Sequence, residues 1–165
     1  MLRLSEATPK DFHIIQSIAY ATWPVTYGNI LTSQQLEYML GLFYSQEMLE
    51  KNFNENGHRF LLVHEGSEIV GFASYEHHYL QTKTTRLHKL YVLPEVQGKQ
   101  AGTILLSEVE QLARAANSNT VSLNVNKFNK AYSFYLKKGF VVVGEIDLPI
   151  GDGYLMEDYV MEKVL

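Results

Sequence analysis

The feature that most constrains the fold is a change of hydrophobic period near Phe60. Between residues 9 and 56, apolar side chains recur at helical spacing behind capping residues such as Thr32 and Ser45. From Phe60 on, two β-rich runs, 60–64 and 69–75, flank a short turn that contains glycine, which predicts a β-hairpin. Helices therefore dominate residues 9–56, and strands of a sheet follow them.

The rest of the chain supplies more strands and alternates them with helices. The patterns predict strands over residues 2–6, 86–92, 120–125, 140–145 and 159–165, and helices over 103–116 and 130–138. Pro94 ends one strand, and Gly139 stops the last helix at its C′ position. With no repeat, linker or low-complexity segment, we expect an α/β chain in which residues 1–165 form a single domain.

Composition narrows the classes of function. The 165 residues are 46% hydrophobic, which is enough for a sizeable core, and they include no cysteine, which excludes disulfides, thiolate metal sites and a cysteine nucleophile. The formal net charge is -4 and no Lys/Arg run exceeds two residues, so we expect no nucleic-acid partner. A cationic small molecule suits this charge better.

The lengths of the apolar segments bear on where in the cell the protein is expected. No apolar stretch approaches the roughly 20 residues that a membrane span needs, so we expect no membrane partner. Glu6 stands where a secretory signal would continue as an apolar run. The default expectation is a cytoplasmic protein.

The segment from Leu90 to Thr103 has the layout of a phosphate-binding loop. It joins a strand to a helix through small residues, and the free N–H groups of a helix's first turn stabilise an anion. Lys99 adds a positive charge. A glycine-containing turn before a helix is more often only a turn, and the spacing fits neither a Walker loop nor a dinucleotide fingerprint.

A second informative segment covers residues 126–140. Asn129 can cap a helix there, and Phe128, Tyr132 and Tyr135 lie near one another at helical spacing. Such an aromatic stripe is more often part of a core than of an active site. A tyrosine hydroxyl can nevertheless donate a proton to a leaving group.

Together, these segments resemble the GNAT superfamily of N-acetyltransferases. The family's coenzyme loop, Gln/Arg-x-x-Gly-x-Gly/Ala, corresponds to Gln97-Gly98-Lys99-Gln100-Ala101-Gly102. Gln100 replaces the first glycine, and it can serve there if its φ stays negative. The family's later motif is met by Asn129, Ala131 (one residue early), Tyr135, Gly139 and Phe140. The resemblance implies a mixed, mostly antiparallel sheet of about seven strands flanked by helices.

The resemblance also implies acetyl-CoA as cosubstrate and a set of residues that would bind it. Backbone groups of Leu90 and Val92 would pair with the pantetheine arm, the amides of residues 97–103 would hold the pyrophosphate, and Asn129 would contact the coenzyme arm. Tyr135 would face the departing thiolate as the acid. The full set is Leu90, Tyr91, Val92, Gln97, Gly98, Lys99, Gln100, Ala101, Gly102, Thr103, Asn129, Tyr132 and Tyr135.

The sequence leaves the general base open. Glu76, His78 and His88 lie on or just beyond the predicted central strands, an ordered water is an alternative, and His58 is expected outside the site. Without a cysteine for an acyl-enzyme, direct attack by the amine in a ternary complex is the economical mechanism. No His-Glu-x-x-His spacing occurs, so we expect no catalytic metal.

The acceptor is expected to be a small primary amine. Residues 22–27 and a late Gly-Asp pair faintly resemble polyamine acetyltransferases of the PaiA type. Acidic residues near the C-terminal strands can attract a cationic amine, and a role as ordinary solvated loop residues explains them at least as well. They are Glu145, Asp147, Asp152, Glu157 and Asp158. The alternative is an inactive GNAT-fold module that binds acyl-CoA. Related folds often form homodimers, which is analogy alone.

Overall fold

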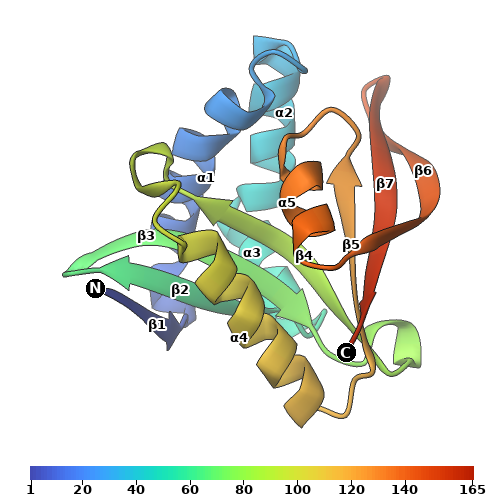
Figure 1. Cartoon of the computed structure of the whole chain (residues 1–165). Helices are drawn as coiled ribbons and strands as arrows, with labels where there is room; N and C mark the ends of the chain where they lie inside the picture. The colour runs from blue at the N-terminus through green and yellow to red at the C-terminus, as the bar shows by residue number, and fades with distance from the viewer.

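One seven-stranded sheet, in the order β1-β2-β3-β4-β5-β7-β6, organises the computed structural model, which describes residues 1–165 (Figure 1). The strands are β1 (Leu2–Glu6), β2 (Arg59–Glu65), β3 (Glu68–Glu76), β4 (Thr84–Val92), β5 (Thr120–Asn126), β6 (Val141–Gly151) and β7 (Tyr154–Val164). Only β4 and β5 pair in parallel. The predicted mixed, mostly antiparallel sheet is confirmed.

Five helices cover the two faces of this sheet (Figure 1). They are α1 (Phe12–Tyr27), α2 (Ser33–Tyr44), α3 (Gln46–Asn54), α4 (Ala101–Ala115) and α5 (Ala131–Lys137). The predicted capping box at Thr32 is present, since its hydroxyl accepts from the Gln35 N–H at 3.1 Å and its own N–H donates to Gln35 Oε1 at 3.0 Å. None of these helices combines the length and the apolar composition needed to cross a bilayer.

Successive side chains of β2 point to opposite faces of the sheet and belong to two hydrophobic cores. Phe60 and Leu62 pack against α1, α2 and α3 on one face, whereas Leu61 and Val63 pack against α4 on the other. Tyr135 of α5 belongs to the second core. Because both cores depend on the same strands, the helices on the two faces hold the sheet, and any site within it, in one geometry.

The sheet opens between β4 and β5. Their pairing covers only Thr84–Leu87 of β4 and Thr120–Leu123 of β5, and the two strands then diverge (Figure 1). Beyond Leu87, β4 stays paired with β3 on its other side, while β5 stays paired with β7 as far as Asn126. A gap lined by backbone therefore forms inside the sheet, where polar groups are free to meet a ligand.

The C-terminal hairpin is longer than its sequence pattern predicts. The patterns indicated strands over 140–145 and 159–165, but β6 and β7 pair from Val141 to Gly151 and from Tyr154 to Val164. A solvated edge strand needs backbone pairing but no apolar face, so hydrophobicity alone does not mark it. At its tip, Gly151 has φ of 96° and contacts α2, where the Tyr38 hydroxyl donates to the Ile150 carbonyl at 2.8 Å.

Candidate active site

Two cavities meet at Tyr135. The first, of about 590 Å³, lies beside residues 97–103 and is called here the loop cavity. The second, of about 500 Å³, lies in the gap between β4 and β5 and is called the sheet cavity. The residues that line both are Leu90, Tyr91, Asn129, Ala131 and Tyr135. One continuous site therefore runs from the start of α4 into the split sheet.

The start of α4 presents free backbone donors to the loop cavity. The first i to i−4 hydrogen bond runs from the Ile104 N–H to the Gln100 carbonyl at 2.9 Å, which leaves the amides of Ala101, Gly102 and Thr103 unpaired within the helix. These donors stand at the positive end of the helix dipole. They fit the phosphates of a coenzyme.

Gln100 does not meet the condition set for it from the sequence. Its φ is 69°, in the left-handed region, rather than negative. The turn into α4 demands this conformation at the position where the family usually has glycine, so Gln100 carries local backbone strain. Gly98 has φ of 89°, which a glycine adopts without strain.

Most of the predicted coenzyme-binding residues line the loop cavity. They are Leu90, Tyr91, Val92, Gln97, Gly98, Gln100, Ala101, Gly102, Thr103, Asn129 and Tyr135. Lys99 and Tyr132 do not: the Lys99 ammonium lies 3.3 Å from the Glu65 carboxylate, and the Tyr132 ring packs 4.8 Å from that of Tyr159. The backbone layout is thus assembled without help from these two side chains.

The free edge of β4 carries the backbone groups expected to contact a pantetheine arm. Leu93 donates its N–H to the Val70 carbonyl on the β3 side at 2.8 Å. Backbone groups alternate along a strand, so those of Leu90 and Val92 face the opposite, open side. The Gln97 amide agrees with this direction, because its Nε2 donates to the Val92 carbonyl at 3.2 Å.

Tyr135 sits at the junction with its hydroxyl uncommitted. The side chain is buried, its ring contacts those of Phe134 and Phe140, and its hydroxyl makes no hydrogen bond within the protein. Burial raises the pKa of the phenol above its usual range, so the hydroxyl keeps its proton throughout the working pH range. It is therefore available as a hydrogen-bond or proton donor.

Asn129 orients the elements around that junction. Its Oδ1 accepts from the Ala131 N–H at 2.9 Å, which fixes the start of α5, and its Nδ2 donates to the Tyr27 hydroxyl at 3.2 Å. Tyr27 is also 3.1 Å from the hydroxyl of Tyr91. Helix α1, strand β4 and helix α5 are thus tied together directly behind Tyr135.

Glu76 and His88 lie together, as candidate bases should. His88 Nε2 is 2.9 Å from Glu76 Oε1, and His88 lines the sheet cavity. His58, which was expected outside the site, stacks on His88 with ring centroids 3.9 Å apart, because the turn after α3 places it beside the end of β3. The third candidate, His78, is exposed in the turn after β3 and lines neither cavity.

The three side chains also have the composition of a metal site. One atom each from His58, Glu76 and His88 lies within 4.8 Å of the others. Burial lowers the pKa of His58 to about 4 and that of His88 to about 2, so both rings are neutral near pH 7. The positive charge of Lys89 acts on both rings and that of Arg86 acts on His88, which opposes a cation here, whereas the Glu76 carboxylate favours one.

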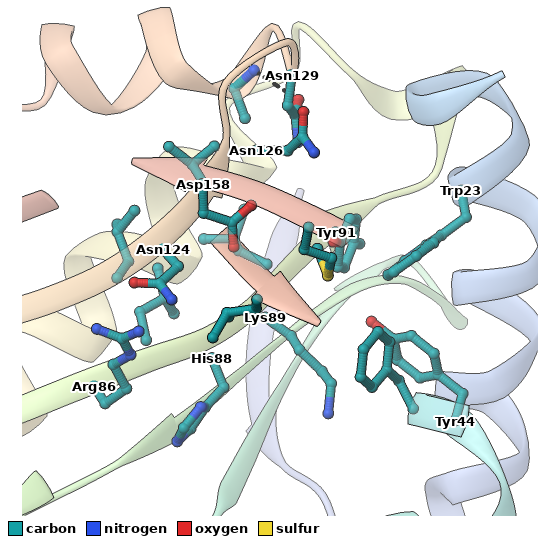
Figure 2. A pocket seen from close by; sticks show the side chains of 18 of the residues that line it. Trp23, Tyr44, Arg86, His88, Lys89, Tyr91, Asn124, Asn126, Asn129 and Asp158 are labelled. Carbon is teal, nitrogen blue, oxygen red and sulfur yellow. Dashed lines mark hydrogen bonds between the residues drawn. The ribbon is translucent and has the colours of Figure 1, made fainter. Parts of the chain in front are cut away.

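Of the five acidic residues named near the C-terminal strands, Asp158 alone lines the sheet cavity. It projects from β7 into the sheet cavity (Figure 2), the residue is only 4% exposed, and its Oδ1 has no hydrogen-bond partner. Burial raises its pKa to about 6, although Arg86 and Lys127 act against the shift. A carboxylate with this pKa can hold an ammonium group or accept its proton near neutral pH.

Helix α1 contributes further lining from residues 22–27, the segment that resembles the PaiA type in sequence. Trp23 packs 4.8 Å from Tyr27 and 5.9 Å from Tyr91, which makes an aromatic wall of the sheet cavity (Figure 2). Thr22 and Thr26 line the loop cavity. These residues share the helical spacing of ordinary core positions, and only the path of α1 across the open edge brings them to the site.

Known proteins share this architecture over the whole chain. A spermidine N(1)-acetyltransferase of Thermoplasma acidophilum is 26% identical over 167 aligned residues, covering 98% of this chain and 96% of the relative. The crystal structure of PaiA N-acetyltransferase from T. acidophilum, in complex with coenzyme A, superposes with a TM-score of 0.83 at 25% identity and covers 100% of this chain and 99% of that one.

A second solved structure supports the fold. A GCN5-related N-acetyltransferase from Rhodopseudomonas palustris has a TM-score of 0.84 at 22% identity, covering 99% of this chain and 95% of that one. The profile of the acetyltransferase (GNAT) domain matches residues 29–161, which is most of the 165-residue chain. With the free amides of α4, the split sheet and the buried Tyr135 in place, this match shows that the chain belongs to the GNAT acetyltransferase family.

Proposed function

We propose that this chain, acting as a single domain, transfers an acetyl group from acetyl-CoA to a small primary amine by direct attack in a ternary complex. The observation that carries the proposal is the meeting of the two cavities at Tyr135, with free helix amides in one and an unpartnered carboxylate in the other. The coenzyme's phosphates fit the amides of residues 101–103, and the amine fits the sheet cavity.

The chain's own groups have distinct parts in this reaction. A free backbone N–H on the open side of β4, at Leu90 or Val92, polarises the thioester carbonyl. The new bond joins the amine nitrogen to the acetyl carbon, and the carbon–sulfur bond breaks. Tyr135 donates its proton to the departing sulfur, while a base takes the proton that the nitrogen loses.

For the base we propose Asp158, beside the sequence-derived pair of Glu76 and His88. Asp158 has the pKa, about 6, that suits proton transfer near neutral pH, and its Oδ1 is free of other partners. The pair can also act as a unit, since His88 can pass a proton to Glu76 across their 2.9 Å contact. We propose that neither route uses a metal, because Lys89 and Arg86 oppose a dication beside His88.

The similar proteins indicate which class of amine to test first. The spermidine acetyltransferase and the PaiA protein, both from T. acidophilum, point to polyamines as the first acceptors to test. The faint PaiA-type resemblance of the sequence supports the same starting point. The net charge of -4 favours encounter with cationic amines.

The proposal is tested by measuring thiol release from acetyl-CoA with a broad panel of amines, in buffer that contains EDTA. We expect turnover with at least one amine, unchanged by the chelator. Acetyl-CoA should also raise Tm progressively with its concentration above Kd, as mass action requires. Activity that is lost in EDTA and restored by Zn²⁺ would overturn the metal-free proposal, and the lack of any Tm shift at millimolar acetyl-CoA would overturn coenzyme binding.

The inactive-module alternative depends on Gln100, and a glycine there separates the two. The backbone already has φ of 69° at this position, so Gln100→Gly preserves the loop and should change kcat/KM for acetyl-CoA by less than about threefold, under ~0.7 kcal/mol. The measurement is initial rate at varied acetyl-CoA. A gain of more than tenfold would mean that the glutamine side chain obstructs the coenzyme and would favour the module.

A further inference from the structure

The sheet cavity has a negative side and a positive side. On the β5 and β7 side, Asp158 Oδ1 and Asn124 Oδ1 are buried without a hydrogen-bond partner. Both atoms are acceptors only, so they call for a donor from a ligand. An ammonium group supplies several donors together with the charge that a carboxylate needs.

The positive side is formed by Lys89 of β4. Its side chain extends toward Tyr44 (Figure 2), with the ammonium 5.1 Å from the centre of that ring, and it lines the sheet cavity. No carboxylate lies within 4.0 Å of this ammonium, and the five ion pairs of the protein all involve other residues. Burial lowers its pKa to about 8, and no nearby charge opposes the shift.

Arg86 also makes no ion pair within 4.0 Å, but it differs from Lys89 in its other partners. Its guanidinium donates to Ser122 Oγ at 3.2 Å and lies within the field of several carboxylates, among them Asp158, Glu76 and Glu162. These carboxylates offset part of its charge, although burial still lowers its pKa. Lys89 is therefore the cation in this cavity that has room for an anion from outside.

These observations count against a long polycation. A polyamine places a second positive charge some distance from the reacting nitrogen, and within the sheet cavity that charge would approach the uncompensated ammonium of Lys89. A ligand with a negative group at that end would instead complete the pair. Unpaired acceptors line one end of the cavity, and an unpaired cation lines the other. A ligand that pairs with both carries a positive group and a negative group.

We infer that the acceptor is a small amino-carboxylate, whose amine lies against Asp158 and Asn124 and whose carboxylate pairs with Lys89. This inference rests on the proposed acetyltransferase function and narrows its substrate class. The ion pair restores to the Lys89 ammonium the electrostatic stabilisation that burial removed. The packed rings of Trp23 and Tyr44 line the same cavity and reduce the access of water to that pair.

Matched substrates test the carboxylate directly. Ornithine and putrescine differ only by the carboxylate, as do lysine and cadaverine. We expect kcat/KM to favour the amino acid of each pair by at least about tenfold, the effect of ~1.4 kcal/mol. In the absence of turnover, ornithine should also raise the Tm of the coenzyme A complex more than putrescine does.

Lys89→Met removes the charge and keeps a side chain of similar length. It should raise KM for the amino acid by about tenfold or more, leave KM for acetyl-CoA unchanged, and leave the diamine no worse a substrate. Lys83→Met, at an exposed lysine just before β4, is the matched control and should change nothing.

The outcomes separate this inference from the function on which it rests. If diamines are acetylated better than amino acids, or if Lys89→Met weakens both equally, the carboxylate pairing is wrong and the acetyltransferase proposal stands. If neither class, nor any other amine, is acetylated, the proposed function fails as well. Loss of the preference in Lys89→Met with retention in Lys83→Met is the result that supports the inference.

Discussion

Tyr135→Phe is expected to lower kcat by roughly 10- to 1,000-fold, the range for loss of one general acid, with a smaller change in KM for acetyl-CoA. The interaction with sulfur strengthens as negative charge develops, so its loss appears in kcat. The fold should be unaffected, because the hydroxyl makes no hydrogen bond within the protein and the ring keeps its contacts with Phe134 and Phe140.

The matched control for this substitution is Tyr75→Phe. Tyr75 is also buried in the core that contains Tyr135, but it lines neither cavity. Both variants should melt near the wild-type temperature, and only the Tyr135 variant should lose activity. If Tyr135→Phe keeps kcat within about a factor of two, then solvent or another side chain protonates the thiolate and the assignment is wrong.

The sequence predicted best where one local pattern decides the structure. The hairpin around Gly66, the strand that leads to Val92 and the helix stopped by Gly139 all appear as predicted, since each depends on neighbouring residues. The ends of β6 and β7 were missed because pairing between solvated strands depends on each other's backbone rather than on hydrophobicity.

The site residues show the same difference between what a local pattern predicts and what depends on distant segments. The motif residues Gln97, Gly102 and Tyr135 could be found from spacing within the segments 90–103 and 126–140, and they line the two cavities. His58 could not, because it joins the site only through His88, which is distant in sequence. Asp158 could be named only as one of five acidic residues, because the divergence of β4 and β5 is what brings it to the cavity. The residues next to each of them in the sequence do not mark it as part of a site.

The conformation of Gln100 shows a further limit. A glycine motif names residue types, whereas the chain must satisfy φ values, and a glutamine at 69° satisfies them at a cost in local strain. The amides of residues 101–103 are placed by the helix start rather than by the side chain at position 100. The predicted coenzyme loop can therefore present these amides while departing from the motif.

Asp158→Asn is expected to lower kcat/KM by about 100-fold or more, within the usual range for loss of a general base, and to do so without loss of stability. The wild-type pH profile of kcat/KM should rise through a limb near the Asp158 pKa of about 6, as the carboxylate ionises, and the variant should lack that limb. Asp147→Asn, at an exposed position on β6, is the control that should keep both the limb and the rate. A limb that persists in Asp158→Asn and disappears in Glu76→Gln would assign the base to the Glu76–His88 pair instead.

Stability distinguishes this role of Asp158 from a structural one. The folded-state pKa of about 6 lies above the ordinary value of 3.8, so the folded protein binds the proton more tightly than the unfolded chain does. Stability from this group is complete below pH 3.8 and is lost as pH rises through about 6. Asparagine stays neutral, so the Tm of Asp158→Asn should match that of the wild type near pH 4 and exceed it at pH 8. A buried carboxylate that served only to pair with Arg86 would give the opposite result, a lower Tm at pH 8, because its removal would leave the guanidinium without its partner.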